Sequence, residues 1–247
     1  MKKFVLGAVA AAAMLAPGLA HAETNAVIGL NYNSLDSDGF DMDTHGLTGA
    51  FNHDFANGWQ VQVDGAAQRL DLNGCCIGEN YLAVHYGKRT DTYSFAGFLG
   101  TQDWGYVSGL SVGVEGQMHF AQASIGGSIS YVDFGDYPLN GTNIDLNGSY
   151  YFNPNFSVGA DIDYTDNDIG DWTSYGISGE YRFDNSPASV TLGYRQIDVD
   201  STDLNMWSIG VNFDLGTGSL QDRRTHGPSW DGASSLNSGF GLFGGVA

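Results

Sequence analysis

The stretch MWSIGVNFDL, residues 206–215, decides the fold class of this chain. Bulky apolar residues alternate strictly with small or polar ones along it, at Trp207, Ile209, Val211, Phe213 and Leu215. A period of two predicts a β-strand with one apolar face and one polar face. The rest of the sequence decides whether the apolar face meets a protein core or lipid.

Residues 1–22, MKKFVLGAVAAAAMLAPGLAHA, have the layout of a secretory signal peptide rather than of a fold element. Two lysines precede a short apolar run, and Ala20 and Ala22 form an A-x-A cleavage site. The apolar run is shorter than the ~20 residues that a membrane-spanning helix needs. We therefore expect export and cleavage after Ala22, which leaves a mature chain that begins at residue 23.

Composition limits the class of protein. The chain has 247 residues, of which 36 are Gly, and only 15% are charged although 13% are aromatic. Its formal net charge of −19 argues against nucleic acid as a partner. No stretch after the signal peptide is long and apolar enough for a membrane-spanning helix. An exported chain of this kind is either a soluble all-β protein or a membrane β-barrel.

Alternating segments recur along the mature chain, and each is about as long as a tilted strand that crosses a bilayer. The twelve segments are residues 25–35, 43–53, 59–72, 79–88, 92–101, 106–119, 123–134, 142–152, 156–165, 172–183, 188–199 and 204–215. Every second connection is a short turn, and the others are longer or more acidic. This arrangement predicts an all-β, membrane-spanning, up-and-down antiparallel barrel of about 12 strands, with both termini on the turn side.

The two faces of these segments indicate that lipid lies outside. In residues 156–165, Phe156 and Ile162 share one face, while Ser157 and Asp161 share the other. The polar face of the segments is mostly Gly, Ser, Asn and Gln, whereas the exposed face of a soluble barrel is rich in Lys and Glu. Aromatic residues lie near strand ends on the apolar face, as in the girdles at membrane interfaces. A soluble all-β protein is therefore the less favoured alternative.

Residues 25–215 resemble bacterial outer-membrane β-barrel proteins of the porin-like family in this overall pattern. A more local match lies in the last strand, where the assembly signal of the family reads polar, any, Gly, any, any, hydrophobic, any, hydrophobic. Its positions are filled by Ser208, Gly210, Phe213 and Leu215. The resemblance implies insertion into outer-membrane lipid by the barrel-assembly machinery, and it implies no cofactor.

The chain departs from that family after Leu215, where the family usually ends. Residues 216–247 are rich in Gly and Ser and show no sustained period of two or 3.6. We expect a disordered tail on the periplasmic side. The alternative is a segment that folds into the lumen or binds a periplasmic partner, with Arg223 and Arg224 meeting inward acids.

Successive side chains of a strand alternate between its two faces, and this side-chain parity places nine ionisable residues on the inward face. These predicted pore-lining residues are Asp64, His85, Glu115, Asp145, Asp161, Asp163, Glu180, Arg182 and Arg195. Acids outnumber bases among them, so a water-filled lumen would favour cations. Arg195 is expected to reach Asp161 across Gly176, which would brace the wall or narrow the pore. The alternative is that the two are separate, solvated side chains. Twelve strands give a backbone diameter of about 24 Å, between that of filled eight-stranded barrels and that of open porins.

Two further features are candidate sites. The connection DSDGFDMD offers a weak divalent-cation site at Asp36, Asp38, Asp41 and Asp43, because alternate carboxylates supply oxygen ligands. The alternative there is a solvated acidic loop. Cys75 and Cys76 are adjacent in a predicted surface loop, and their redox state is open. No nucleophile motif or zinc-ligand spacing accompanies the histidines, so we do not expect an enzyme.

Together these features predict a porin-like channel for passive diffusion of small polar solutes, with a weak preference for cations. The alternative is a non-conducting outer-membrane barrel with a blocked lumen, which acts as a structural or adhesin-like surface protein. A channel needs a continuous wet path, whereas a blocked barrel has the tail or a loop folded into the lumen. The sequence contains no ladder of basic residues of the kind that a channel for anionic sugars needs.

Overall fold

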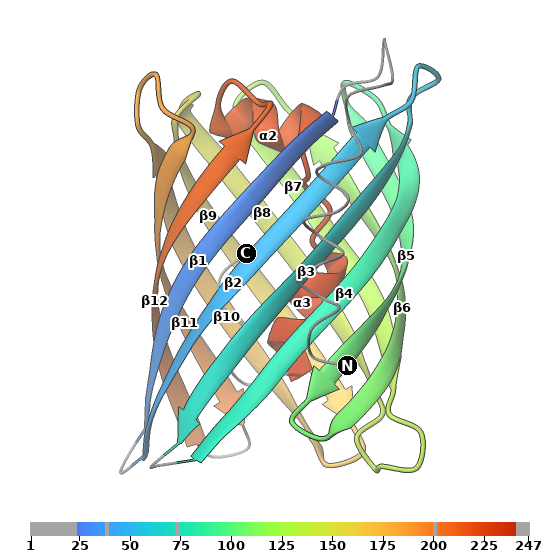
Figure 1. Ribbon diagram of the computed structural model, residues 1–247, viewed down its shortest axis with the longest axis vertical. Coiled ribbons are helices and arrows are strands. Elements are labelled where there is room, and N and C mark those ends of the chain that lie inside the picture. The colour runs from blue at the N-terminus through green and yellow to red at the C-terminus, as the bar shows by residue number, and fades with distance from the viewer. Residues whose placement is uncertain (1–23, 38–39, 73–74, 200–201, 241–247) are drawn as a thin grey trace.

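A computed structural model shows a closed barrel in which twelve antiparallel strands pair in sequence order (Figure 1). It describes residues 24–37, 40–72, 75–199 and 202–240. The prediction of an up-and-down barrel with twelve strands is therefore confirmed. No helix among the described residues is long and apolar enough to cross a membrane.

The strands follow the predicted segments in order. They are β1 (Thr24–Ser37), β2 (Phe40–Asp54), β3 (Trp59–Leu72), β4 (Cys75–Arg89), β5 (Tyr93–Trp104), β6 (Val107–His119), β7 (Ala123–Asp133), β8 (Gly141–Asn153), β9 (Phe156–Asn167), β10 (Gly170–Arg182), β11 (Ala188–Val199) and β12 (Thr202–Leu215). β1 closes the barrel by pairing with β12, with Ala26 opposite Leu215. The start of β1 and the end of β12 therefore lie at the same end of the barrel, which we call the turn end (Figure 1).

At the opposite end, the loop end, several strands are longer than predicted. β4 begins at Cys75 rather than at residue 79, and β5 runs to Trp104 rather than to residue 101. The expectation that Cys75 and Cys76 lie in a loop is therefore wrong, since both belong to a strand that pairs with β3. Pairing continues past the apolar segments because each backbone N–H and C=O still finds a partner on the neighbouring strand.

The alternation of the sequence turns apolar side chains outward and small polar ones inward. Leu30, Val114 and Leu192 on the outer face are 58%, 62% and 59% exposed. Aromatic rings also gather there, and Trp59 stacks on Tyr86 with ring centroids 4.9 Å apart. This polarity is the reverse of that of a soluble barrel, as the sequence predicts for a wall that faces lipid.

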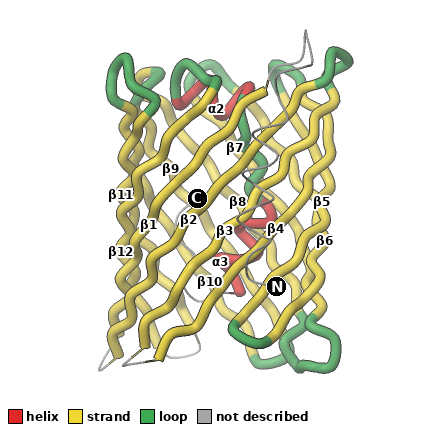
Figure 2. The backbone as a smooth tube through the Cα atoms, viewed as in Figure 1, coloured by secondary structure: helices red, strands yellow, loops and turns green. Residues whose placement is uncertain are grey.

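After β12 the chain turns into the barrel and forms two helices. These are α2 (Leu220–His226), at the turn-end mouth of the barrel, and α3 (Gly232–Phe240), deeper inside the ring of strands (Figure 2). α3 packs against β4 to β9, so it occupies one arc of the lumen. We call residues 216–240 the plug.

The expectation of a disordered tail is wrong for the plug, and the alternative of folding into the lumen is confirmed. The hydroxyl of Ser219 caps α2 by accepting the N–H of Asp222 at 3.1 Å. Leu220, Ala233 and Leu236 are almost fully buried. Helix capping and burial of these side chains offset the conformational entropy that a Gly- and Ser-rich segment loses on ordering.

Candidate functional site

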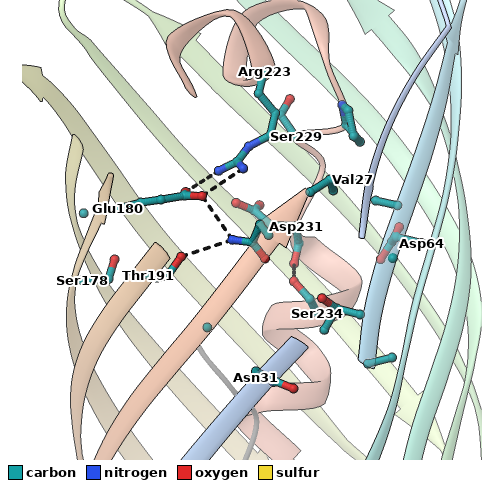
Figure 3. Close-up of a pocket in the computed structure, with 18 of the residues that line it drawn as sticks. Val27, Asn31, Asp64, Ser178, Glu180, Thr191, Arg223, Ser229, Asp231 and Ser234 are labelled. Atoms are coloured by element: carbon teal, nitrogen blue, oxygen red, sulfur yellow. Dashed lines mark hydrogen bonds and ion pairs between the residues drawn. The ribbon is translucent and has the colours of Figure 1, made fainter. Parts of the chain in front are cut away.

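Arg223 anchors the turn-end part of the plug to the barrel wall. Its guanidinium donates to both carboxylate oxygens of Glu180 on β10, with 3.0 Å between Nη1 and Oε1 (Figure 3). It also donates to Asp214 on β12 at 3.2 Å. Burial opposes the charge, but the carboxylates of Glu180 and Asp214 raise the pKa of Arg223 above its ordinary value. The expectation that this arginine meets inward acids is confirmed.

Two more arginines complete this anchor. Arg182, a predicted lumen residue, donates to the carbonyl oxygen of Thr217 at 3.0 Å and lies 3.4 Å from Asp214. Arg224 bonds Asp231 within the plug itself at 3.1 Å and the Asn147 side chain on β8 at 2.9 Å. The inward faces of β8, β10 and β12 thereby hold the plug through charge-assisted hydrogen bonds, which are stronger than neutral ones.

Side chains of the barrel wall bind backbone groups at and just before the start of α3. One carboxylate oxygen of Glu115 accepts the N–H of Asp231 at 3.0 Å and that of Gly232 at 2.8 Å. This contact satisfies donors that a helix leaves unpaired at its N-terminus. Gln62 makes two bonds with the backbone of Trp230, at 2.7 and 3.1 Å. We did not single out Gln62 from the sequence, although its parity already placed it on the inward face.

His85 joins two predicted lumen acids into one buried group. Its Nε2 atom lies 2.5 Å from the Asp64 carboxylate, and its Nδ1 atom bonds Glu115. All three side chains are buried, and the His85 ring lies against Phe98 with centroids 5.1 Å apart. Sequence parity predicts that these residues face inward, but it does not predict that β3, β4 and β6 bring them into contact. Asp64 and Glu115 are therefore not free charges on a pore wall.

Arg195 makes the ion pair that the sequence predicts. It lies 2.7 Å from Asp161 and 2.6 Å from Asp163. A Cβ atom at Gly176 would collide with the Asp161 carboxylate, so glycine makes room for the pair. The remaining predicted lumen acid, Asp145, accepts a hydrogen bond from Asn147 at 2.7 Å. The predicted contact between Arg195 and Asp161 is thereby confirmed.

Apolar side chains inside the loop end of the barrel are the feature that sequence reasoning missed. Six of them form what we call the loop-side cluster, which consists of Leu35, Met42, Leu70, Trp172, Ile197 and Met206. A second group joins Ala233 and Leu236 of α3 to Phe98, Val132 and Phe134 of the wall. The signal was present in the sequence, because Leu35 and Met42 occupy inward positions by parity while exposed acids occupy the outward ones.

A cavity of about 240 Å³ remains beside the plug. It is bordered by the plug residues Arg223, Asp231 and Ser234 and by small polar side chains of the wall (Figure 3). The wall residues include Asn31, Thr48, Ser149, Ser178, Thr191, Ser208 and Asn212. The lining as a whole comes from β1 to β4 and from β8 to β12, so the cavity lies on the side of the lumen away from β5 to β7, which help to hold α3.

The candidate cation site lies at the loop end of β1 and β2. Asp36 and Asp43 are exposed there, and Asp43 accepts a hydrogen bond from Tyr32 at 2.8 Å. Asp38 lies outside the described residues, as does the side chain of Asp41. Within the described part of the chain, no group of three His, Cys, Asp or Glu side chains is placed to hold a metal ion. The assembly-signal residues Phe213 and Leu215 are exposed on the outer face of β12.

No family model matches this sequence, and no curated protein matches it either. Among solved structures, the NanC porin superposes with a TM-score of 0.61 at 13% identity, over 76% of this chain and 100% of its own. An outer-membrane channel from Pseudomonas putida F1 gives 0.56 at 10% identity, over 80% and 97%. The KdgM porin gives 0.53 at 13% identity, over 75% and 98%. The chain therefore has the fold of outer-membrane porin-like barrels.

Proposed function

We propose that this protein is a porin-like channel of the bacterial outer membrane through which small polar solutes diffuse passively. The apolar exterior suits lipid, the inner wall is polar, and the similar structures are described as porins or outer-membrane channels. The expected signal peptide, residues 1–22, lies outside the described residues and supports export.

The cavity beside the plug is the observation that carries this proposal. α3 fills one arc of the lumen, while inward Ser, Thr and Asn side chains line the cavity along the other arc. Such a wall suits hydrated solutes, because its hydroxyl and amide groups replace hydrogen bonds to water. The anchors of the plug are polar as well, so water can substitute for them when the plug shifts. We interpret the described conformation as the resting state of a channel restricted by its plug.

The proposed channel has a weak preference for cations. Asp161, Asp163 and Glu180 are paired with arginines, whereas Asp145 accepts a hydrogen bond from the neutral side-chain amide of Asn147. An excess of inward acid concentrates cations. KdgM also has a structure described as a complex with disordered oligogalacturonate. A lumen with an acid excess does not suit a polyanion, so we do not extend that ligand to this chain.

The proposal includes partners at three surfaces. Outer-membrane lipid contacts the apolar exterior. The barrel-assembly machinery recognises the signal in β12 at Ser208, Gly210, Phe213 and Leu215. Divalent cations bind weakly at the acidic ends of β1 and β2, where Asp36, Asp38, Asp41 and Asp43 lie in the sequence.

A non-conducting barrel is the second candidate, and the plug itself favours it. The plug is ordered, its helices bury apolar side chains, and it is anchored on several strands. A lumen closed in this way would serve a structural or surface-interaction role. The two candidates differ in whether the plug moves.

A reversible disulfide between the plug and the wall distinguishes a channel restricted by its plug from a non-conducting barrel. A Cβ atom built at Gly232 lies 3.1 Å from that of Ser128 on β7, close to the separation of about 3.5–4.5 Å found in disulfides. The variant Ser128→Cys, Gly232→Cys would be made in a Cys75→Ser, Cys76→Ser background and refolded as residues 23–247. Single-channel current and reversal potential would be recorded in a planar bilayer, before and after a thiol reductant, with disulfide formation checked by thiol titration.

For a channel, we expect a current that is weak or absent in the oxidised form and rises on reduction. In a salt gradient its reversal potential should lie toward the equilibrium potential of the cation. The background protein without the added cysteines is the control, and it should not respond to the reductant. Folded protein that carries no current in either redox state and also takes up no glucose into lipid vesicles would favour the non-conducting barrel. Equal current in both states would show that a channel exists but that the plug does not control it.

A further inference from the structure

The loop-side cluster lies on the half of the barrel wall that α3, which packs mainly against β4 to β9, does not cover. Its six side chains come from six adjacent strands, β10 to β12 and β1 to β3. Each is only 1% to 7% exposed. Leu35 lies opposite Met42 on one side and Met206 on the other, so the cluster is continuous across the β1–β12 seam.

The cluster lies in series with the polar cavity. Moving along β1 from the cavity toward the loop end, the inward residues are Asn31, Asn33 and then Leu35. Asn33 donates to Thr44 at 2.8 Å, which forms the last polar layer on this side. Arg195, with its acidic partners, lies opposite Met206 in the β11–β12 pairing. A solute leaving the cavity toward the loop end therefore passes polar groups first and an apolar layer next.

The outer face of the same strand ends has the opposite character. Exposed acids occupy the outward positions there, namely Asp36, Asp43, Asp71, Asp198 and Asp203. Apolar residues inside and charged residues outside are the arrangement of a water-exposed barrel, so these ends project beyond the lipid-facing section. Burial of the cluster would be explained if it only formed a hydrophobic core that stabilises these projecting strand ends. It does not by itself explain why two of the six positions hold methionine rather than branched side chains.

We infer that the loop-side cluster is a hydrophobic gate that admits small uncharged solutes and resists ions. An apolar constriction cannot replace the hydration shell of an ion, whereas an uncharged solute gives up far less on entering it. The unbranched side chains of Met42 and Met206 adopt other rotamers readily, so a narrow opening forms without breaking strand pairing. This inference rests on the proposed channel function and specifies its solute class.

Substitution of the two methionines in the full mature chain tests the gate. In Met42→Gln, Met206→Gln the side chains keep their length and lack of branching but become polar. Met42→Leu, Met206→Leu is the matched control, because it keeps the cluster apolar. Current would be measured in potassium chloride across planar bilayers, and uptake of glucose would be measured by swelling of lipid vesicles. Folding would be checked by heat-modifiable mobility on gels, and Ile197→Thr provides a second polar variant if the glutamine pair does not fold.

The gate predicts an ion conductance at least about tenfold higher for the glutamine pair than for wild type, since a wetted constriction conducts. It also predicts glucose uptake in wild type and little change in either quantity for the leucine control. Glucose uptake in wild type without increased conductance in the folded polar variants would overturn the gate and leave the channel intact. Absence of both current and uptake in every folded form would overturn the proposed function and the gate together.

Discussion

The guanidinium of Arg223, in a helix inside the lumen, faces the carboxylate of Glu180 on strand β10 and bonds both of its oxygens. Glu180 also accepts hydrogen bonds from Ser189 and Asn212, at 2.5 and 3.1 Å. The wall therefore holds this carboxylate through two contacts that do not involve the plug. This pair joins two parts of the chain that the sequence analysis treated as separate, the barrel and its tail.

The first prediction concerns this pair. Arg223→Gln leaves Glu180 buried without its main counter-charge, and breaking one partner of a buried ion pair costs about 3–5 kcal/mol. Because only the plug depends on this contact, we expect local release of the plug while the barrel stays folded. Trypsin should then cut after Arg224 much faster than in wild type, whereas the heat-modifiable gel shift of the barrel should persist.

Arg69→Gln is the control for that experiment. Arg69 is more than half exposed and lies 3.2 Å from Asp71 on the outer face of the same β3 strand. Exposed pairs contribute about 0–1 kcal/mol, so this variant should be cut no faster than wild type. Equal rates of cleavage in Arg223→Gln and wild type would show that the arginine does not hold the plug.

The second prediction concerns His85, which lies between the carboxylates of Asp64 and Glu115. His85→Leu brings two unshielded buried acids together and should lower the free energy of unfolding by about 3–5 kcal/mol. Adding Asp64→Asn and Glu115→Gln removes the repulsion and should recover a large part of the loss. Urea denaturation followed by tryptophan fluorescence would measure both changes, and a triple variant no more stable than His85→Leu would contradict this account.

The barrel could be predicted because apolar and polar residues alternate along each strand, and this alternation depends only on neighbouring residues in the sequence. In MWSIGVNFDL each residue is assigned to one face by the backbone alone, so strand number, inward parity and the pair between Arg195 and Asp161 all follow from register. The same logic placed Asp64, His85 and Glu115 inward. It did not show that they touch, because their contacts depend on the heights of three strands and on the plug that covers them.

The plug and the apolar loop end could not be predicted in this way. Residues 216–240 have no repeating pattern, since α2 and α3 are short and their contacts are with groups distant in the sequence. The loop-side cluster was missed because we assumed that the inward face stays polar over its whole length. That assumption holds only within the lipid-facing section, because beyond it water lies outside and the polarity of the wall inverts, as Leu35 and Asp36 show.

The third prediction concerns ion selectivity. Arg195→Gln removes the cation that lies within 2.7 Å of both Asp161 and Asp163, so the lumen gains net negative charge. Any current should then shift toward cation selectivity, because confined acids concentrate counter-ions. Asp161→Asn with Asp163→Asn should shift it the other way. Reversal potentials in a potassium chloride gradient measure both effects, and shifts of the same sign would rule out control by these charges.

The fourth prediction concerns the lipid-facing surface. Leu192 is 59% exposed on the outer face of β11. Leu192→Arg places a charge in the hydrocarbon region and should destabilise the folded barrel by about 2–4 kcal/mol. Tyr106 is fully exposed in the turn between β5 and β6, so Tyr106→Arg is the control and should have little effect. Equal destabilisation by the two substitutions in lipid vesicles would contradict a lipid-facing wall at Leu192.

The last prediction separates assembly from stability. Phe213 in β12 and Phe95 in β5 are 44% and 48% exposed on the outer face, so replacing either by alanine removes a similar contact with lipid. Stabilities measured after refolding should therefore fall by similar amounts. Only Phe213 belongs to the proposed assembly signal, so Phe213→Ala alone should slow insertion when purified barrel-assembly machinery in vesicles is supplied with the unfolded chain. If Phe95→Ala slows insertion as much, the last strand carries no special signal, and lipid contact alone accounts for the effect of both substitutions.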